Sequence, residues 1–163
     1  MSERPKKTDD AILTAAAIRL AADFCKEWPS DFPPDKESMD ILIEDLRDTL
    51  EQAFELDGYH LAKEMDAKGY DPDARMVEVL DRAYYCVDEE LRKACETWVS
   101  ESGIVPPDVG SRVTCAECEG VGQILNNHPD GRSTVCFADM GHSPKGPTRG
   151  RILEWEKLTP AKS

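Results

Sequence analysis

Two consecutive prolines, Pro106 and Pro107, divide this chain of 163 residues into two segments of different character. The residue before a proline is kept out of the α-helical region, so no helix continues through this pair. Before the prolines, apolar residues recur every three or four positions, which indicates helices; after them, short runs alternate apolar and polar residues, which indicates strands. The sequence therefore predicts two domains, a helical one over residues 1–105 and a β domain over residues 106–163.

The β segment contains four short runs with the period of half-buried strands, separated by turns rich in glycine, asparagine and proline. Such closely spaced strands are typical of a small closed or nearly closed barrel, which leaves few strand edges exposed. We therefore expect an α+β protein, in which an all-α bundle of about four helices precedes a small β-barrel. The expected strands are Arg112–Cys115, Gly122–Leu125, Ser133–Phe137 and Arg151–Trp155.

The order of residues in this segment also resembles a known family. Val109–Val113 is followed by the glycine pair of Glu119–Gly122, then by Val135–Phe137, and finally by Glu154–Leu158. This order is similar to that of SH3-like barrels of the KOW and Tudor type, in which a Gly-x-Gly strand bends sharply and a final strand closes the barrel. The resemblance covers about a third of the chain and implies an SH3-like barrel over residues 106–160.

A second pattern overlaps the first. Cys115, Cys118, Gly120 and Gly122 fit a Cys-x-x-Cys-x-Gly-x-Gly repeat, and so resemble the cysteine-rich zinc domain of J-protein chaperones. That resemblance implies a zinc site, since the cysteine pair supplies two thiolates from one tight turn. The second Cys-x-x-Cys of that family is absent here, and the strand pattern accounts for Cys115 as a small core residue, so we predict no cofactor. If zinc is bound, its predicted ligands are Cys115, Cys118, Cys136 and His142, with His128 as the alternative histidine.

The charge of the chain is concentrated in the helical segment. The formal net charge is −13. Residues 1–105 carry 26 acidic and 13 basic side chains, whereas residues 106–163 carry seven of each. A field of this sign repels DNA and anionic membranes and attracts basic surfaces. We therefore expect a protein partner with a basic surface, no membrane partner, and no direct binding of nucleic acid.

Aspartates, prolines and glycines mark the helix boundaries. An aspartate before a helix accepts hydrogen bonds from the free N–H groups of its first turn, and a glycine after it adopts the left-handed conformation. The expected caps are Asp35, Asp57, Asp71 and, for the first helix, the cluster Thr8-Asp9-Asp10. The predicted helices are Ala11–Trp28, a second after Asp35, Tyr59–Lys68, and a long fourth helix from about Asp73 to Ser102.

The second helix has the clearest pattern in the chain. Its predicted core side holds Met39, Leu42, Ile43, Leu46, Leu50, Ala53 and Phe54. On the other side acidic residues recur at spacings of three and four, which places like charges next to one another at a small cost in stability. We take this stripe as the candidate partner-binding site; the alternative is an ordinary solvated helix face. The stripe consists of Glu37, Asp40, Glu44, Asp48, Glu51 and Glu55.

Several function classes lack their motifs in this sequence. There is no Gly-x-x-x-x-Gly-Lys-Ser/Thr phosphate loop, no Gly-x-Ser-x-Gly elbow and no His-Glu-x-x-His pair, so we expect no enzyme. No apolar run is long enough for a transmembrane helix. Six cysteines without a paired framework favour the reducing cytoplasm.

Two function hypotheses remain. The first is a non-enzymatic acidic module that occupies the nucleic-acid-binding surface of a partner protein. In size and charge the chain resembles the anti-CRISPR and anti-restriction proteins that phages use as inhibitors. The second is an adaptor like the KOW and Tudor proteins, which binds nucleic acid or a transcription complex through the barrel, with or without a structural zinc.

Overall fold

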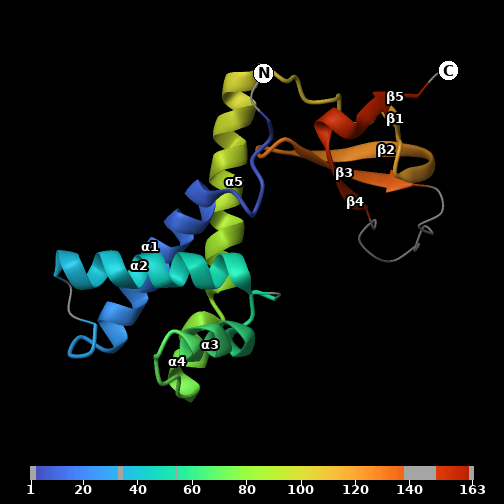
Figure 1. The fold of residues 1–163 in the computed structure, drawn as a ribbon. Coiled ribbons are helices and arrows are strands. Elements are labelled where there is room, and N and C mark those ends of the chain that lie inside the picture. Colours follow the sequence, from blue (N-terminus) through green and yellow to red (C-terminus); the bar gives the residue numbers. More distant parts are fainter. Residues whose placement is uncertain (1–2, 33–34, 54, 138–149, 162–163) are drawn as a thin grey trace. The chain divides into compact units, whose positions relative to one another are not determined.

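The computed structural model describes residues 3–32, 35–53, 55–137 and 150–161. It contains two compact units, one formed by Arg4–Ala94 and the other beginning at Cys95 (Figure 1). The first is helical and the second contains an antiparallel sheet. The predicted α+β order, with helices first and a small β domain second, is therefore confirmed. Among the described residues, no helix is both long and apolar enough to cross a bilayer.

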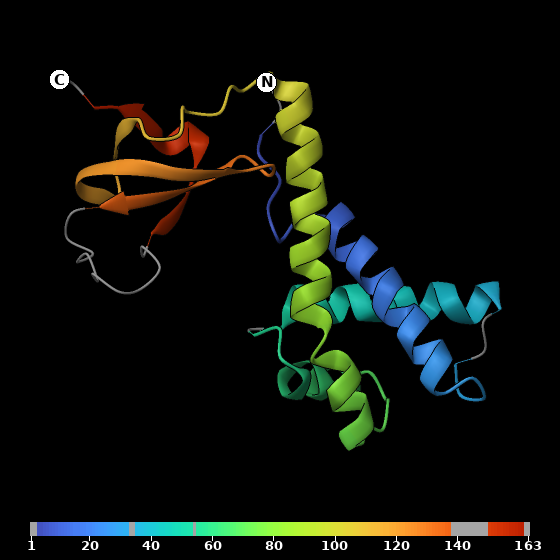
Figure 2. The same ribbon diagram turned by 180° about the vertical axis from the view of Figure 1, so that it is seen from behind.

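The helical unit is built from five helices, the last of which continues into the second unit. They are α1 (Asp10–Glu27), α2 (Lys36–Gln52), α3 (Gly58–Ala67), α4 (Ala74–Leu80) and α5 (Ala83–Ser102). Helix α2 crosses α1, and α3 lies beside α4, in both views of the fold (Figures 1 and 2). Aspartate side chains cap three of these helices, whereas Asp9 at the N-cap of α1 makes no side-chain cap hydrogen bond. Asp35 accepts a hydrogen bond from the Ser38 N–H at 3.0 Å, and Asp57 and Asp73 act in the same way at α3 and α4.

The prediction of one long fourth helix is wrong, because this segment forms two helices, α4 and α5, that are separated at Asp81–Arg82. Tertiary packing explains the break. The carboxylate of Asp81 accepts a hydrogen bond from the backbone N–H of Gly58, which binds the end of α4 to the start of α3. Tyr84 continues the apolar three- and four-residue spacing of the sequence but is 48% exposed, and Ala83 is the buried residue at this turn.

The core of the helical unit forms around the small residues of α1. Ala16, Ala17 and Ala21 are fully buried, and they allow neighbouring helices to approach the α1 backbone closely. Larger side chains fill the remaining space, each contributing about 1.5–3 kcal/mol on full burial. They include Leu20, Phe24, Leu46, Leu61, Met65, Leu80 and Val87.

In the residues that the structure describes, the second unit has five strands in the order β4-β3-β2-β1-β5, with every neighbouring pair antiparallel. The strands are β1 (Arg112–Cys115), β2 (Cys118–His128), β3 (Arg132–Phe137), β4 (Arg151–Glu154) and β5 (Leu158–Pro160). A single 3₁₀ turn, Trp155–Lys157, connects β4 to β5. In the described strands no ladder joins β4 to β5, so the hydrogen-bonded sheet is open there. The predicted alternation is confirmed, since Val113, Cys115, Ile124, Val135 and Phe137 form the core.

Candidate protein-binding face

Four exposed carboxylates lie on the outer side of α2. Glu37, Asp40, Glu44 and Glu51 recur at helical spacing, while the opposite side of the helix buries its leucines. The amphipathic period of α2 therefore presents these acids to solvent. We call these four residues the acidic face.

The other two acids of the predicted stripe differ from these four. Asp48 is half-buried and ion-paired: Arg47 donates to its carboxylate, and Lys68 Nζ lies 3.6 Å from Oδ2. Glu55 is exposed but lies beyond Gln52, the last residue of α2. The helix ends before Glu55, since the backbone at Ala53 is already extended, with φ −66° and ψ 131°. The predicted stripe of six is thus a face of four.

Six of the basic side chains in the helical unit pair with carboxylates outside the acidic face. Arg19 Nη1 lies 2.7 Å from Glu89 Oε2, and this hydrogen bond lowers the pKa of Glu89. Arg82 pairs with Asp23 at 3.1 Å. Further pairs join Lys7 to Asp88, Arg47 to Asp10, Lys68 to Asp45 and Arg75 to Glu27. In the described part of the chain no ion pair includes a residue of the acidic face. The nearest cationic influence that is resolved is the longer-range attraction between Arg47 and Glu51.

One apolar side chain is exposed within the acidic face. Ile41 lies between Asp40 and Glu44 on α2 and is 55% exposed. A single exposed isoleucine is common on protein surfaces. Here its position among unpaired carboxylates means that any partner covering the face also covers an apolar group.

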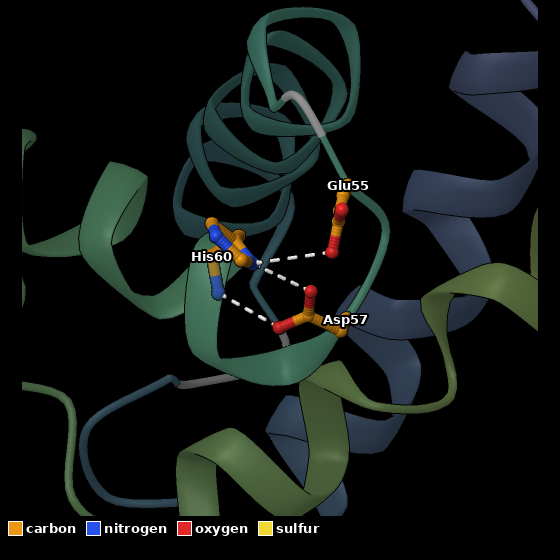
Figure 3. A group of neighbouring side chains, drawn as sticks. All are labelled: Glu55, Asp57 and His60. Atoms are coloured by element: carbon orange, nitrogen blue, oxygen red, sulfur yellow. Dashed lines mark hydrogen bonds and ion pairs between the residues drawn. The ribbon is translucent and has the colours of Figure 1, made fainter.

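Three polar side chains converge at the start of α3, as Figure 3 shows. His60 Nδ1 lies 2.6 Å from Asp57 Oδ2 and 3.9 Å from Glu55 Oε2. Ligand atoms of these three residues lie within 4.8 Å of one another, and a histidine with two carboxylates is a set of donors that divalent cations bind.

Helix capping accounts for this cluster. Asp57 Oδ1 accepts the backbone N–H groups of Tyr59 and His60, each at 3.0 Å, so Asp57 is the N-cap of α3. The hydrogen bond from the His60 N–H is the main reason that the pKa of Asp57 lies below its ordinary value. This cluster was not predicted from the sequence, because Glu55 was expected to belong to the second helix. The available signal was the three-residue spacing of Asp57 and His60, which is that of a capping box.

The predicted zinc ligands are only partly assembled in the described residues. Cys115 and Cys118 face each other at the end of the β1–β2 hairpin, where Cys115 is buried and Cys118 half-buried. His128 lies at the far end of β2 and its Nε2 is 2.9 Å from Thr134 Oγ1. Within the described ranges these cysteines and Cys136 belong to no three-ligand group. His142 lies outside the described residues, and the prediction of no zinc stays a prediction.

No family model, curated protein or solved structure was found to match this chain. Any function proposed for this chain therefore rests on its own sequence and structure.

Proposed function

We propose that this chain is a non-enzymatic protein-binding module, which occupies a basic, nucleic-acid-binding surface of a partner protein through its acidic face. One observation carries the proposal. The four carboxylates of the face are exposed on one side of α2 and have no ion-pair partner in the described residues, whereas Arg47 and Lys68 are held by other acids. In size and charge such a module resembles the phage proteins that block DNA-targeting machinery.

The charge density of the face sets a limit on its electrostatic attraction. From Glu37 to Glu51 the helix rises about 21 Å, so the face carries about one charge per 7 Å. Duplex DNA carries about one charge per 1.7 Å. The face therefore attracts the same basic side chains as DNA, but less strongly per unit length. Contacts other than charge must add to the affinity for a partner.

The alternative function, an adaptor that binds nucleic acid through the β domain, has less support. Arg132 Nε donates to Asp130 Oδ2 at 2.7 Å, and Lys157 pairs with Glu117 at 3.0 Å. The guanidinium of Arg151 lies over the Phe137 ring at 5.7 Å. The carboxylates that pair with Arg132 and Lys157 would compete with phosphates for these two cations.

The proposal is tested with a fluorescent oligolysine peptide, whose binding is followed by anisotropy at low and physiological salt. We expect binding that weakens as salt rises, because exposed charges are screened within about 8 Å at physiological ionic strength. A duplex DNA oligonucleotide should compete by binding the same cations of the peptide. The double variant Glu37→Lys/Glu44→Lys should bind at least about tenfold more weakly.

A matched variant separates the face from the overall charge. Asp66→Lys/Glu78→Lys makes the same change in net charge at exposed positions of α3 and α4. It should retain most of the affinity for oligolysine. If both double variants lose affinity equally, the peptide responds to total charge and the proposed face is wrong.

A further inference from the structure

An apolar groove borders the acidic face. It has a volume of about 220 Å³ and is open to solvent. Its walls come from α1, the residues that follow α1, the first half of α2, and the residue after Gly69. They include Cys25, Asp31, Phe32, Met39, Ile41 and Tyr70.

Contacts among the lining residues hold the groove in place. The rings of Phe32 and Tyr70 stack with centroids 6.0 Å apart. Tyr70 Oη donates to Asp45 Oδ2 at 2.7 Å, which fixes the tyrosine ring, and Cys25 Sγ donates to Met39 Sδ. The groove therefore has an aromatic wall and a sulfur wall, both half-buried. Thioethers adapt to apolar groups of different shapes.

The size of the groove fits a side chain better than a small-molecule ligand. Pockets for drug-sized ligands measure about 300–1,000 Å³, whereas a cavity of about 150 Å³ holds a benzene ring. The groove, at about 220 Å³, lies between these values. One large apolar side chain is the occupant that its volume favours.

Charge around the groove determines what must accompany that side chain. Glu37, Asp40 and Glu44 lie on the α2 side, and Asp31 is exposed at the rim. A neutral apolar segment would cover these carboxylates without pairing them, which is costly. A purely basic segment would leave the groove and Ile41 uncovered. Only a segment with both kinds of side chain satisfies the whole surface.

We propose that the groove binds an apolar side chain from a cationic amphipathic helix of the partner, whose lysine and arginine side chains contact Glu37, Asp40 and Glu44. This inference rests on the proposed function and makes it more specific. The apolar contact supplies the affinity that sparse charges do not. The carboxylates select a basic helix over a neutral one.

Three synthetic peptides of equal length test the proposal by fluorescence anisotropy. The first contains leucine and lysine at helical spacing, so that one face is apolar; the second has the same composition in scrambled order; the third is oligolysine. We expect the amphipathic peptide to bind about tenfold more tightly than the other two. It should also keep more of its affinity at high salt, because apolar contacts are not screened.

Single variants locate the apolar contact. Ile41→Ser should reduce the affinity for the amphipathic peptide toward that for oligolysine. Because Ile41 is exposed, its replacement does not disturb the core. Ile18→Ser is the control, since Ile18 is 48% exposed on α1 and does not line the groove. It should leave the affinity for all three peptides unchanged.

The outcomes separate the two proposals. If the amphipathic peptide binds no better than oligolysine, or if Ile41→Ser and Ile18→Ser behave alike, the groove proposal is wrong while the acidic face stands. If Glu37→Lys/Glu44→Lys leaves the binding of every peptide unchanged, the proposed function fails together with the groove.

Discussion

The backbone N–H of Gly58 donates to Asp81 Oδ1 at 2.6 Å, and this hydrogen bond joins the first residue of α3 to the residue that follows α4. Gly58 is buried, and a Cβ at this position would overlap the carbonyl oxygen of Val77. The contact between α3 and α4 thus depends on the absence of a side chain at Gly58.

Replacing Gly58 with alanine should destabilise the helical unit by about 2 kcal/mol or more, since the backbone of Val77 cannot move without disrupting α4. Urea denaturation followed by circular dichroism measures the loss. Ala67→Gly, at the exposed last residue of α3, is the control and should cost about 1 kcal/mol or less. If both variants lowered the free energy of unfolding equally, the close approach of Gly58 and Val77 would not contribute to stability.

Charge reversal on α2 should have opposite effects at its exposed and its paired positions. Glu44→Lys removes repulsion from Asp40 and should leave stability unchanged or raise it by a few tenths of a kcal/mol. Asp48→Lys places a third cation beside Arg47 and Lys68 and should lower stability by about 1 kcal/mol. Thermal melts of the two single variants check this, and a loss of stability in Glu44→Lys would contradict the assignment of its side chain to solvent.

The helix caps make stability depend on pH in acid. The Ser38 N–H holds the pKa of Asp35 below its ordinary value of 3.8, and the His60 N–H does the same for Asp57. Because the folded pKa lies below the unfolded one, the caps stabilise the fold fully above the unfolded pKa. That stabilisation is lost as pH falls through the folded pKa, below about pH 4.

The double variant Asp35→Asn/Asp57→Asn should show a shallower fall in melting temperature through this acid range. Asparagine caps a helix about as well as aspartate but does not titrate there. Asp66→Asn, at an exposed position that caps no helix, should follow the wild-type curve. An unchanged acid slope in the double variant would mean that other carboxylates govern acid unfolding.

We predict that the purified, untagged chain contains no stoichiometric zinc. Cys115 packs in the core of the sheet and Cys118 against it, which accounts for the pair without a metal. Elemental analysis of wild type and Cys118→Ser measures the content. Near-stoichiometric zinc in the wild type that is lost in Cys118→Ser would overturn the prediction and favour the zinc-bound alternative.

Features that depend on neighbouring residues were predictable from the sequence. Asp35 and Asp57 were expected as caps and are caps, since an N-cap needs only a short polar side chain before the helix. The cap of α4 was expected at Asp71 and is Asp73, which accepts the Met76 N–H at 2.8 Å. Two acids stand before this helix, and sequence alone does not decide which one reaches the N–H group.

Features that depend on distant residues were not predictable. The break at Asp81–Arg82 contains neither glycine nor proline, and its cause lies at Gly58. Strand β2 is longer than expected because tertiary contacts keep Asn127 in the sheet: its Nδ2 donates to the Pro107 carbonyl oxygen at 2.7 Å.

The acidic face was only half predictable for a similar reason. The spacing of its carboxylates along α2 is a property of the sequence. Which of them are neutralised depends on where basic residues arrive in the fold. Lys68, the C-cap of α3, reaches Asp45 and Asp48 on α2 and leaves the acidic face unpaired.

The uneven pairing of charges has a kinetic consequence. An unneutralised row on one side of α2 gives the helical unit a directional field, so a basic partner would be drawn toward that side before contact. For a partner held as we propose, the association rate would fall steeply with salt, since it depends on this long-range attraction. The dissociation rate would depend mainly on the short-range contacts of the groove and would change much less. A kinetic experiment should therefore distinguish the two kinds of variant. Charge reversals in the acidic face should lower the association rate, and substitutions in the groove should raise the dissociation rate.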